Sequence, residues 1–175
     1  VCGPTVYNLI HIGNARPMIV FDTFRRYLEY KGYEVRFVSN FTDVDDKIIA
    51  RSKETGIPAD EYARRTIQNI DAVMRDMAID EPTVWLKATQ NIDNIIDFIS
   101  ALIEKGKAYA AGNGDVYFDV TSFKGYGCLS NRTVEDMLDG VRVDNCEEKR
   151  NPADFALWKA AKEGEISWAS PWGNG

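Results

Sequence analysis

The first stretch of the chain, VCGPTVYNLIHIGNAR (residues 1–16), constrains the fold more strongly than any other. It reads as the end of a strand, a Gly-Pro turn and a loop that leads to His-Ile-Gly-Asn at the start of a helix. Glycine at a strand-to-helix junction allows a ligand to approach the backbone, and the first N–H groups of a helix can bind a phosphate. The stretch therefore predicts a nucleotide-phosphate site.

The residues that follow predict a parallel sheet. A helix is expected over residues 14–31, because apolar residues recur at helical spacing and Gly32 can end it. The next segment, EVRFVS (34–39), is rich in β-branched and aromatic residues and predicts a buried strand. Strand, helix and strand at this spacing form a βαβ unit with a right-handed crossover. The chain therefore opens as an α/β fold.

Three further helices are expected in the first part of the chain. The pattern Thr42-x-x-Asp45 is typical of a capping box and predicts a short helix after it. A second helix begins at Pro58, and a third covers residues 90–105. The Pro58 helix should bury one face, since apolar residues follow one another at intervals of four and three. These residues are Ala63, Ile67, Ile70, Met74 and Met77.

After residue 106 the sequence changes to short β segments and loops. Two short strands around a Gly-Asn-Gly turn (112–114) predict a hairpin, and a small helix is expected at 134–138. Residues 154–162 are ambiguous between helix and strand. We expect three parts: residues 1–106 as half of a nucleotide-binding core with a helical extension, 107–152 as a connective insertion, and 153–175 as a return towards the core.

Composition narrows the class of protein. No apolar run has membrane-spanning length and no secretory signal is visible, so we expect a cytoplasmic protein without a membrane partner. Cys2, Cys128 and Cys146 are an odd, widely spaced set, which argues against a disulfide framework. A net charge of -6 is unfavourable for nucleic acid as the main partner of this part. Because Val1 opens inside a structured element, we expect a fragment of a longer protein.

Two motif groups carry a resemblance to a known family. VCGPTVYNLIHIGNARP and FVSNFTDVDDKIIARS are similar to the catalytic core of cysteinyl-tRNA synthetases, which are class I aminoacyl-tRNA synthetases. HIGN occupies the place of the class I signature His-Ile-Gly-His. The resemblance continues through NGDVYFDV and KRNPADFALWKAAKEGE to SWASPWGNG. It implies a Rossmann-type (HUP-like) parallel-sheet core, of which this chain is the N-terminal half with an inserted α+β segment.

The resemblance places ATP around the start of the first helix. His11 would contact ATP and stabilise the charge on the α-phosphate, although a lone histidine is more often structural. Asn14 departs from the second histidine of the signature, and its amide can donate to a phosphate oxygen but cannot carry a positive charge. Gly13 would let the nucleotide lie against the backbone, and Thr5 completes the ATP-binding set. His11 and Asn14 are the candidate catalytic residues.

Three more residues match positions around the amino-acid substrate. Gly3 and Thr42 would line the cysteine pocket, but plain helix capping explains Thr42 equally well from the sequence. Cys2 matches the first zinc ligand of the family, whereas a buried free cysteine is otherwise usually a small hydrophobe. Zinc favours thiolates, and an open fourth position could take the substrate thiol. The resemblance puts the other ligands outside this chain, so we expect it to bind zinc weakly or not at all.

Two residue groups receive structural interpretations. Asp43, Asp45 and Asp46 could hold a divalent metal, but carboxylates in a first helical turn are explained by the helix dipole. Tryptophans at three positions of the C-terminal part are expected to pack in a core: Trp158, Trp168 and Trp172.

The implied activity is ATP-dependent activation of L-cysteine and its transfer to tRNA(Cys), with Mg²⁺ accompanying ATP. Most tRNA contacts would lie outside this chain, which alone should be inactive or nearly so. Two alternatives stay open. One is a cysteine ligase on the same core that acts on an amino-sugar amine in mycothiol synthesis. The other is a non-catalytic nucleotide-binding or interaction module.

Overall fold

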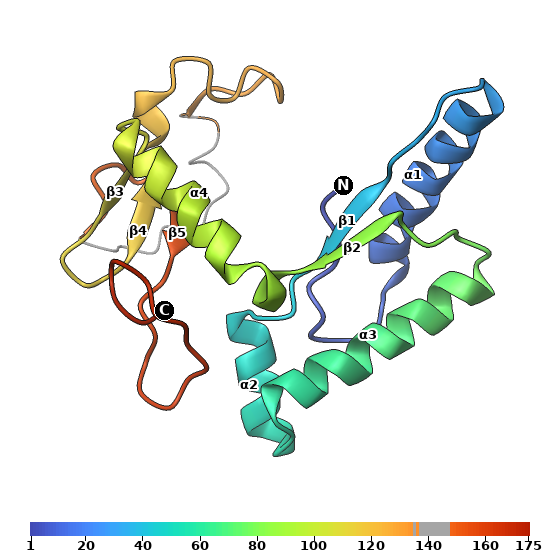
Figure 1. The fold of residues 1–175 in the computed structure, drawn as a ribbon, viewed down its shortest axis with the longest axis horizontal. Coiled ribbons are helices and arrows are strands. Elements are labelled where there is room, and N and C mark those ends of the chain that lie inside the picture. The colour runs from blue at the N-terminus through green and yellow to red at the C-terminus, as the bar shows by residue number, and fades with distance from the viewer. Residues whose placement is uncertain (135, 137–147) are drawn as a thin grey trace. The chain divides into compact units, whose positions relative to one another are not determined.

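The computed structural model describes residues 1–134, 136 and 148–175. The chain divides into two compact units, Val1–Asn91 and Ile92–Gly175, which we call the first and second units (Figure 1). The first unit contains α1 (Ile12–Tyr30), β1 (Val38–Phe41), α2 (Asp46–Thr55), α3 (Ala59–Asp76), β2 (Val84–Lys87) and the 3-10 helix η1 (Ala88–Gln90). The second contains α4 (Ile92–Glu104), β3 (Ala108–Ala110), β4 (Val116–Phe118), the 3-10 helix η2 (Val120–Ser122) and β5 (Phe155–Trp158).

The first unit is built on the parallel pair β1–β2, which lie side by side in Figure 1. Val38 is the first residue of the pair and lies opposite Val84. The N-terminal segment (residues 1–6) runs along the other edge of β1. The Val1 amino group donates to the Val38 carbonyl at 2.8 Å, and Thr5 forms a parallel bridge with Thr42. Three chain segments therefore run parallel, in agreement with the α/β fold predicted from the sequence.

The predicted strand at residues 34–39 begins too early. In the structure β1 starts at Val38, because both of its neighbours also start there: Val1 and Val84 each pair with this residue. Among the described residues between α1 and Val38, only Phe37 forms hydrogen bonds to the segment beside it: its amide donates to the Thr83 hydroxyl, and its carbonyl accepts from the Val84 amide. Strand propensity alone cannot give a strand without a neighbouring ladder.

The helices of the first unit form where the spacing predicted them, with corrected starts. The Pro58 helix, α3, buries Ala63, Ile67, Ile70 and Met74, and Met77 follows it as a partly buried cap. These residues form one core with Val6 of the N-terminal segment, Phe41 of β1, Ile48 of α2 and Ile79, which follows α3. The end of α2 is set by Gly56, whose left-handed φ of 69° suits a glycine C-cap. This core fixes the carboxyl ends of the N-terminal segment and β1, where the candidate site lies.

The second unit packs α4 on a three-stranded antiparallel sheet of order β3-β4-β5. The predicted hairpin is confirmed: Ala108 pairs with Phe118 and Ala110 with Val116. Residues 155–158, which were ambiguous, form strand β5 beside β4. The three tryptophans pack in this unit's core as predicted, and the rings of Trp158 and Trp172 meet edge to face at 6.1 Å.

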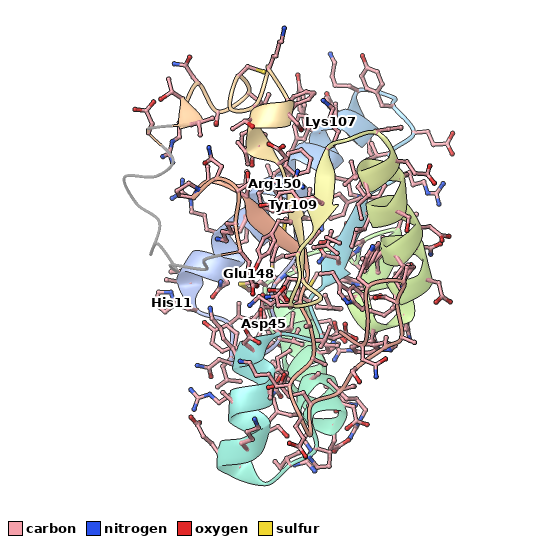
Figure 2. All side chains as sticks on the ribbon, turned by 90° about the vertical axis from the view of Figure 1, so that its left-hand side faces the viewer. His11, Asp45, Lys107, Tyr109, Glu148 and Arg150 are labelled. Carbon is pink, nitrogen blue, oxygen red and sulfur yellow. The ribbon has the colours of Figure 1, made fainter. Side chains whose placement is uncertain are left out.

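A buried carboxylate ties the second unit's loops to its sheet. Asp154 is 2% exposed and accepts hydrogen bonds from the Tyr109 hydroxyl at 2.8 Å and the Val120 amide at 3.0 Å. The Tyr109 oxygen in turn accepts from the Arg150 amide at 2.7 Å, and the Arg150 guanidinium lies 4.0 Å from the Tyr109 ring centroid (Figure 2). Burial and the Asp154 carboxylate raise the pKa of Tyr109. The expected small helix at 134–138 lies mostly outside the described residues.

The fold class is confirmed as mixed α/β with a parallel sheet in the first unit. The three-part division at residues 106 and 152 stays a prediction. None of the described helices is long and apolar enough to cross a membrane.

Candidate nucleotide and amino-acid site

The N-terminus of α1 is organised by His11. The helix begins at Ile12, two residues earlier than predicted, and His11 is its N-cap. The imidazole Nδ1 accepts a hydrogen bond from the Gly13 amide at 3.1 Å. The Asn14 side-chain oxygen accepts from the His11 amide at 3.3 Å, which completes a reciprocal capping box. The capping pair thus consists of the two candidate catalytic residues.

This cap fixes the direction of the His11 ring. In a neutral imidazole one nitrogen is the acceptor and the other carries the proton. Because Nδ1 accepts from a backbone amide, the proton belongs on Nε2, on the side of the ring that faces away from the cap. His11 is exposed, so this N–H can reach a ligand at the helix N-terminus, where the helix dipole also favours negative charge.

Asn14 and Gly13 support the same arrangement. Since the Asn14 carbonyl oxygen is used by the cap, its NH₂ group is the end available to a ligand, and donation to a phosphate oxygen stays a prediction. A Cβ at Gly13 would lie 3.3 Å from the His11 Nδ1, tighter than an ordinary contact. Glycine at this position therefore leaves room for the capping imidazole, in addition to any approach of a nucleotide.

Gly3 serves close strand packing. A Cβ at Gly3 would lie 1.7 Å from the Asn40 carbonyl oxygen, so no side chain fits. The Gly3 amide donates to the Asn40 side-chain oxygen at 2.8 Å. The backbone of β1 thus occupies the space that a Gly3 side chain would take. A substrate could reach the Gly3 backbone only from the face that points away from β1.

Thr42 is not the helix cap that the capping-box pattern suggested. The N-cap of α2 is Asp45, which accepts from the Lys47 amide at 2.9 Å, and the helix starts at Asp46. Thr42 instead ends the β1 ladder: its amide donates to the Pro4 carbonyl at 3.1 Å, and its hydroxyl oxygen accepts from the Asn40 NH₂ group at 3.4 Å. The Thr42 hydroxyl is therefore not used to cap a helix. It lies beside Thr5 at the carboxyl end of the parallel strands, which is where parallel sheets bind ligands.

The acidic cluster has structural partners. Asp43 accepts from the Thr89 hydroxyl at 2.6 Å and the Thr89 amide at 3.0 Å, which links the end of β1 to η1. Asp43 is therefore not in the first helical turn, contrary to the prediction, whereas Asp45 caps the helix and Asp46 opens it. The helix-dipole explanation is therefore wrong for Asp43, which binds Thr89 instead, whereas Asp45 and Asp46 lie at the helix start as predicted.

Cys2 lies on the N-terminal segment beside an apolar cavity. Its thiol is exposed and free, and so is that of Cys128, while Cys146 lies outside the described residues. In the parts of the chain that the structure describes, no group of three or more potential metal ligands comes together.

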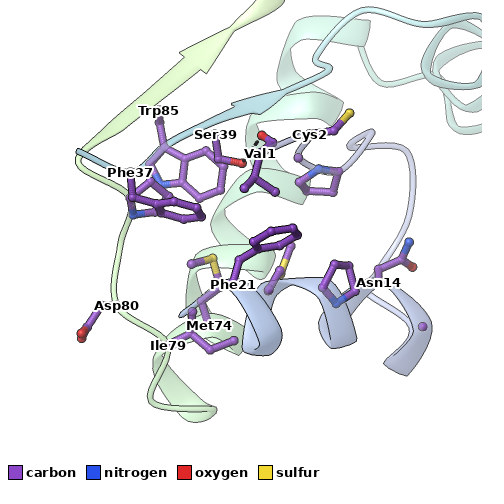
Figure 3. Close-up of a pocket in the computed structure, with 16 residues that line it drawn as sticks. Val1, Cys2, Asn14, Phe21, Phe37, Ser39, Met74, Ile79, Asp80 and Trp85 are labelled. Carbon is purple, nitrogen blue, oxygen red and sulfur yellow. Dashed lines mark hydrogen bonds between the residues drawn. The ribbon is translucent and has the colours of Figure 1, made fainter. Parts of the chain in front are cut away.

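The cavity beside Cys2 has a volume of about 140 Å³, below the roughly 300–1,000 Å³ of typical ligand pockets. Figure 3 shows Phe21, Phe37 and Trp85 around it, with Asn14 at the start of α1. The start of α1 beside this cavity is exposed.

Sequence reasoning missed the residues that hold the loop before α1. The Tyr62 hydroxyl of α3 donates to the Tyr7 carbonyl at 3.1 Å, and the Lys47 ammonium lies 4.7 Å from the centroid of the Tyr7 ring. Asn40, which contacts both Gly3 and Thr42, was missed as well. Apart from the contact between Asn40 and Thr42, these contacts join residues far apart in the sequence, so local patterns do not signal them.

The arrangement combines donors for an anion with hydrogen-bonding groups for a small polar molecule. The His11 Nε2, the Asn14 NH₂ group and the helix N-terminus can stabilise negative charge. The Thr42 hydroxyl lies at the carboxyl end of β1, and the Gly3 backbone lies beside Asn40 of the same strand. Such a site fits phosphoryl chemistry without a covalent enzyme nucleophile.

Comparison with known proteins gives matches along the entire chain. The family described as tRNA synthetases class I (C) catalytic domain matches residues 1–175. A Clostridioides difficile (strain 630) protein named Cysteine--tRNA ligase is 57% identical over 175 residues, which is 100% of this chain and 37% of that protein. Proteins of the same name from Petrotoga mobilis and Bacillus cytotoxicus are 55% and 54% identical over the same lengths. The chain thus spans about 37% of the length of these curated relatives.

Proposed function

Because the chain belongs to the class I (C) tRNA synthetase catalytic-domain family, we propose that the full-length protein encoded by its gene is a cysteine–tRNA ligase. The observation that carries the proposal is the identity of 54–57% with proteins of that name over all 175 residues. The capped helix N-terminus with an outward-facing His11 supports it, since it suits an ATP phosphate.

The proposed reaction has two steps. The carboxylate of L-cysteine attacks the α-phosphorus of ATP, the bond to the bridging oxygen breaks, and pyrophosphate leaves with cysteinyl-adenylate as the product. A terminal ribose hydroxyl of tRNA(Cys) then attacks the activated carbonyl, and AMP leaves. Both steps depend on alignment of the reactants and on stabilisation of charge at phosphate oxygens.

Residues around α1 receive roles towards ATP in this proposal. His11 donates from Nε2 to an α-phosphate oxygen as charge builds on it, and Asn14 donates from its NH₂ group. Gly13 lets the nucleotide lie against the backbone, and Thr5 contacts ATP from the adjoining strand end. Mg²⁺ accompanies the ATP phosphates, where its charge offsets theirs.

Gly3, Thr42 and Cys2 receive roles towards cysteine. The Thr42 hydroxyl hydrogen-bonds the amino acid, and the backbone at Gly3 lines the pocket on the side that β1 leaves open. Cys2 fits as one thiolate ligand of Zn²⁺, since its thiol is free and exposed. Bound zinc would select a thiol over a hydroxyl, because thiolate ligands suit this metal. The described residues hold no group of three or more potential metal ligands, so the proposal assigns the remaining zinc ligands to the rest of the protein.

The proposal extends to partners and compartment. The net charge of -6 makes this part of the protein an unfavourable surface for tRNA, so most tRNA contacts are assigned to the rest of the full-length protein. The free thiols of Cys2 and Cys128 are consistent with a reducing cytoplasm. The names of the relatives favour the tRNA ligase over the amino-sugar ligase and over a non-catalytic module.

The test follows labelled cysteine in the full-length protein with ATP, Mg²⁺, zinc and total tRNA. The proposal predicts label on tRNA in an ATP-dependent reaction. Adenylate without tRNA charging would favour the amine ligase instead. If neither product forms with correctly folded protein, the enzyme interpretation fails and the binding module takes its place.

A further inference from the structure

Asn40 connects the two residues assigned to the cysteine pocket. Its side-chain oxygen accepts from the Gly3 amide at 2.8 Å, and its NH₂ group donates to the Thr42 hydroxyl oxygen at 3.4 Å. Gly3 lies 37 positions before Asn40, and Thr42 lies two positions after it. One partly buried amide thus spans the gap between the N-terminal segment and the end of β1.

Chemistry fixes the orientation of this amide. A backbone N–H can only donate, so the atom that faces Gly3 must be the Asn40 oxygen. The NH₂ group then necessarily faces Thr42, and an NH₂ group can only donate. The Thr42 hydroxyl oxygen is therefore an acceptor in this contact.

The side chains of β1 replace a regular backbone ladder at this place. Backbone hydrogen bonds join the two segments at Val38 and at Thr42, but between them the Asn40 side chain takes the Gly3 amide. The preceding residue of β1, Ser39, also contacts the N-terminal segment: its hydroxyl donates to the Val1 carbonyl at 3.2 Å, the bond drawn dashed in Figure 3. The two neighbouring side chains thus both tie the N-terminal segment to β1, and Asn40 alone of the pair also reaches Thr42.

We propose that Asn40 is a positioning residue that turns the Thr42 hydroxyl into a hydrogen-bond donor towards the amino-acid substrate. A hydroxyl has one proton, and when its oxygen accepts from Asn40 that proton is free to point away from β1. It then donates to an acceptor atom of bound cysteine. This inference rests on the proposed function, because it takes Thr42 as a substrate contact.

The sharpest variant is Asn40→Asp in the full-length protein. A carboxylate still accepts from the Gly3 amide, but it also accepts from the Thr42 hydroxyl and so reverses that hydrogen bond. Cysteine-dependent ATP–pyrophosphate exchange should show a KM for cysteine raised by at least about tenfold, as expected when a hydrogen bond to a charged group is lost. The KM for ATP should stay within about twofold, because His11 and α1 are not touched.

A mutant cycle separates positioning from a structural role. In the Thr42→Val background, where no hydroxyl remains to be oriented, Asn40→Asp should change the KM for cysteine by less than about threefold. Ser39→Ala is the matched control, since it removes the neighbouring tie to the N-terminal segment and does not reach Thr42. It should lower the melting temperature yet leave both KM values unchanged. Asn40→Ala, which deletes both contacts, serves if the aspartate variant does not fold.

The outcomes are distinct. The inference is overturned if Asn40→Asp leaves the KM for cysteine unchanged. It is also overturned if Asn40→Asp raises this KM equally in the wild-type and Thr42→Val backgrounds. In both cases the proposed function stands. Ser39→Ala raising the KM for cysteine as much as Asn40→Asp would also overturn it, since any loosening of the segment would then suffice. Absence of cysteine-dependent exchange in the folded wild-type protein would overturn the proposed function itself.

Discussion

Gly3→Ala tests whether strand packing or substrate access explains this glycine. The added Cβ would lie 1.7 Å from the Asn40 carbonyl oxygen, whereas contacts below 3.0 Å essentially never occur, so the segments must separate by more than an ångström. Such a shift breaks the 2.8 Å bond from the Gly3 amide to Asn40. Overpacking costs about 1–3 kcal/mol and one or two lost hydrogen bonds cost about 1 kcal/mol each. We therefore expect a loss of about 2–5 kcal/mol.

Hydrogen exchange at the β1 amides, measured on the full-length protein, reads this loss locally. Because about 1.4 kcal/mol is a factor of ten, local opening should accelerate exchange of residues 38–42 by a factor of roughly thirty to several thousand. The control is Gly112→Ala, since a Cβ there meets nothing within 4 Å. That variant should leave exchange within about a few-fold of the wild type. If Gly3→Ala behaves like the control, the close-packing explanation is wrong.

Three further predictions concern stability. Asp154→Ala leaves the Val120 amide and other buried donors unpaired, so urea unfolding should show the second unit destabilised by about 2–5 kcal/mol. Tyr109→Phe should cost less, and equal losses for the two variants would contradict the network. Asp43→Ala should cost about 1–3 kcal/mol, and the double variant with Thr89→Val should cost little more, because the pair acts as a unit. Hydrogen bonds from two α3 arginines lower the pKa of Glu61 from 4.5 to about 2, so ionised Glu61 stabilises the fold above pH 4.5 and this contribution is lost as the pH falls through about 2. Glu61→Gln should therefore melt below the wild type at pH 7, with a difference that disappears near pH 2; a constant difference would refute the cause.

Much of the fold follows from local sequence. Helical spacing and glycine stops predict both ends of α1 and α4 to within two residues and the start of α3 to within one, and the Gly-Asn-Gly turn predicts the hairpin. The predicted start of α2 is wrong, since the helix begins at Asp46 and not directly after Thr42. The start of β1 does not follow, because it depends on where Val1 and Val84 begin to pair. The cap of α2 is also ambiguous locally, since Thr42, Asp43 and Asp45 can each accept an amide hydrogen bond.

The sequence names the candidate residues of the site but does not predict the contacts between them. The glycine and histidine of the first loop point to a phosphate site through their chemistry and position. That His11 caps α1 is not evident, because histidine is an unusual cap and the helix was expected to begin at residue 14. The contact between Gly3 and Asn40 spans 37 positions and follows only from the parallel pairing.

The most direct test of the site is the rate of adenylate formation by His11→Asn in the full-length protein, measured in a single turnover with saturating cysteine and ATP. Asparagine is a good helix cap, so the variant should keep the start of α1 and melt near the wild-type temperature. With its oxygen on the cap, the asparagine NH₂ group takes the place of the imidazole Cδ2 and does not reach the position of the Nε2–H donor. We predict a rate lower by about 10²–10³, the usual cost of losing one donor to developing negative charge. A folded variant that forms adenylate at the wild-type rate would contradict the role of His11.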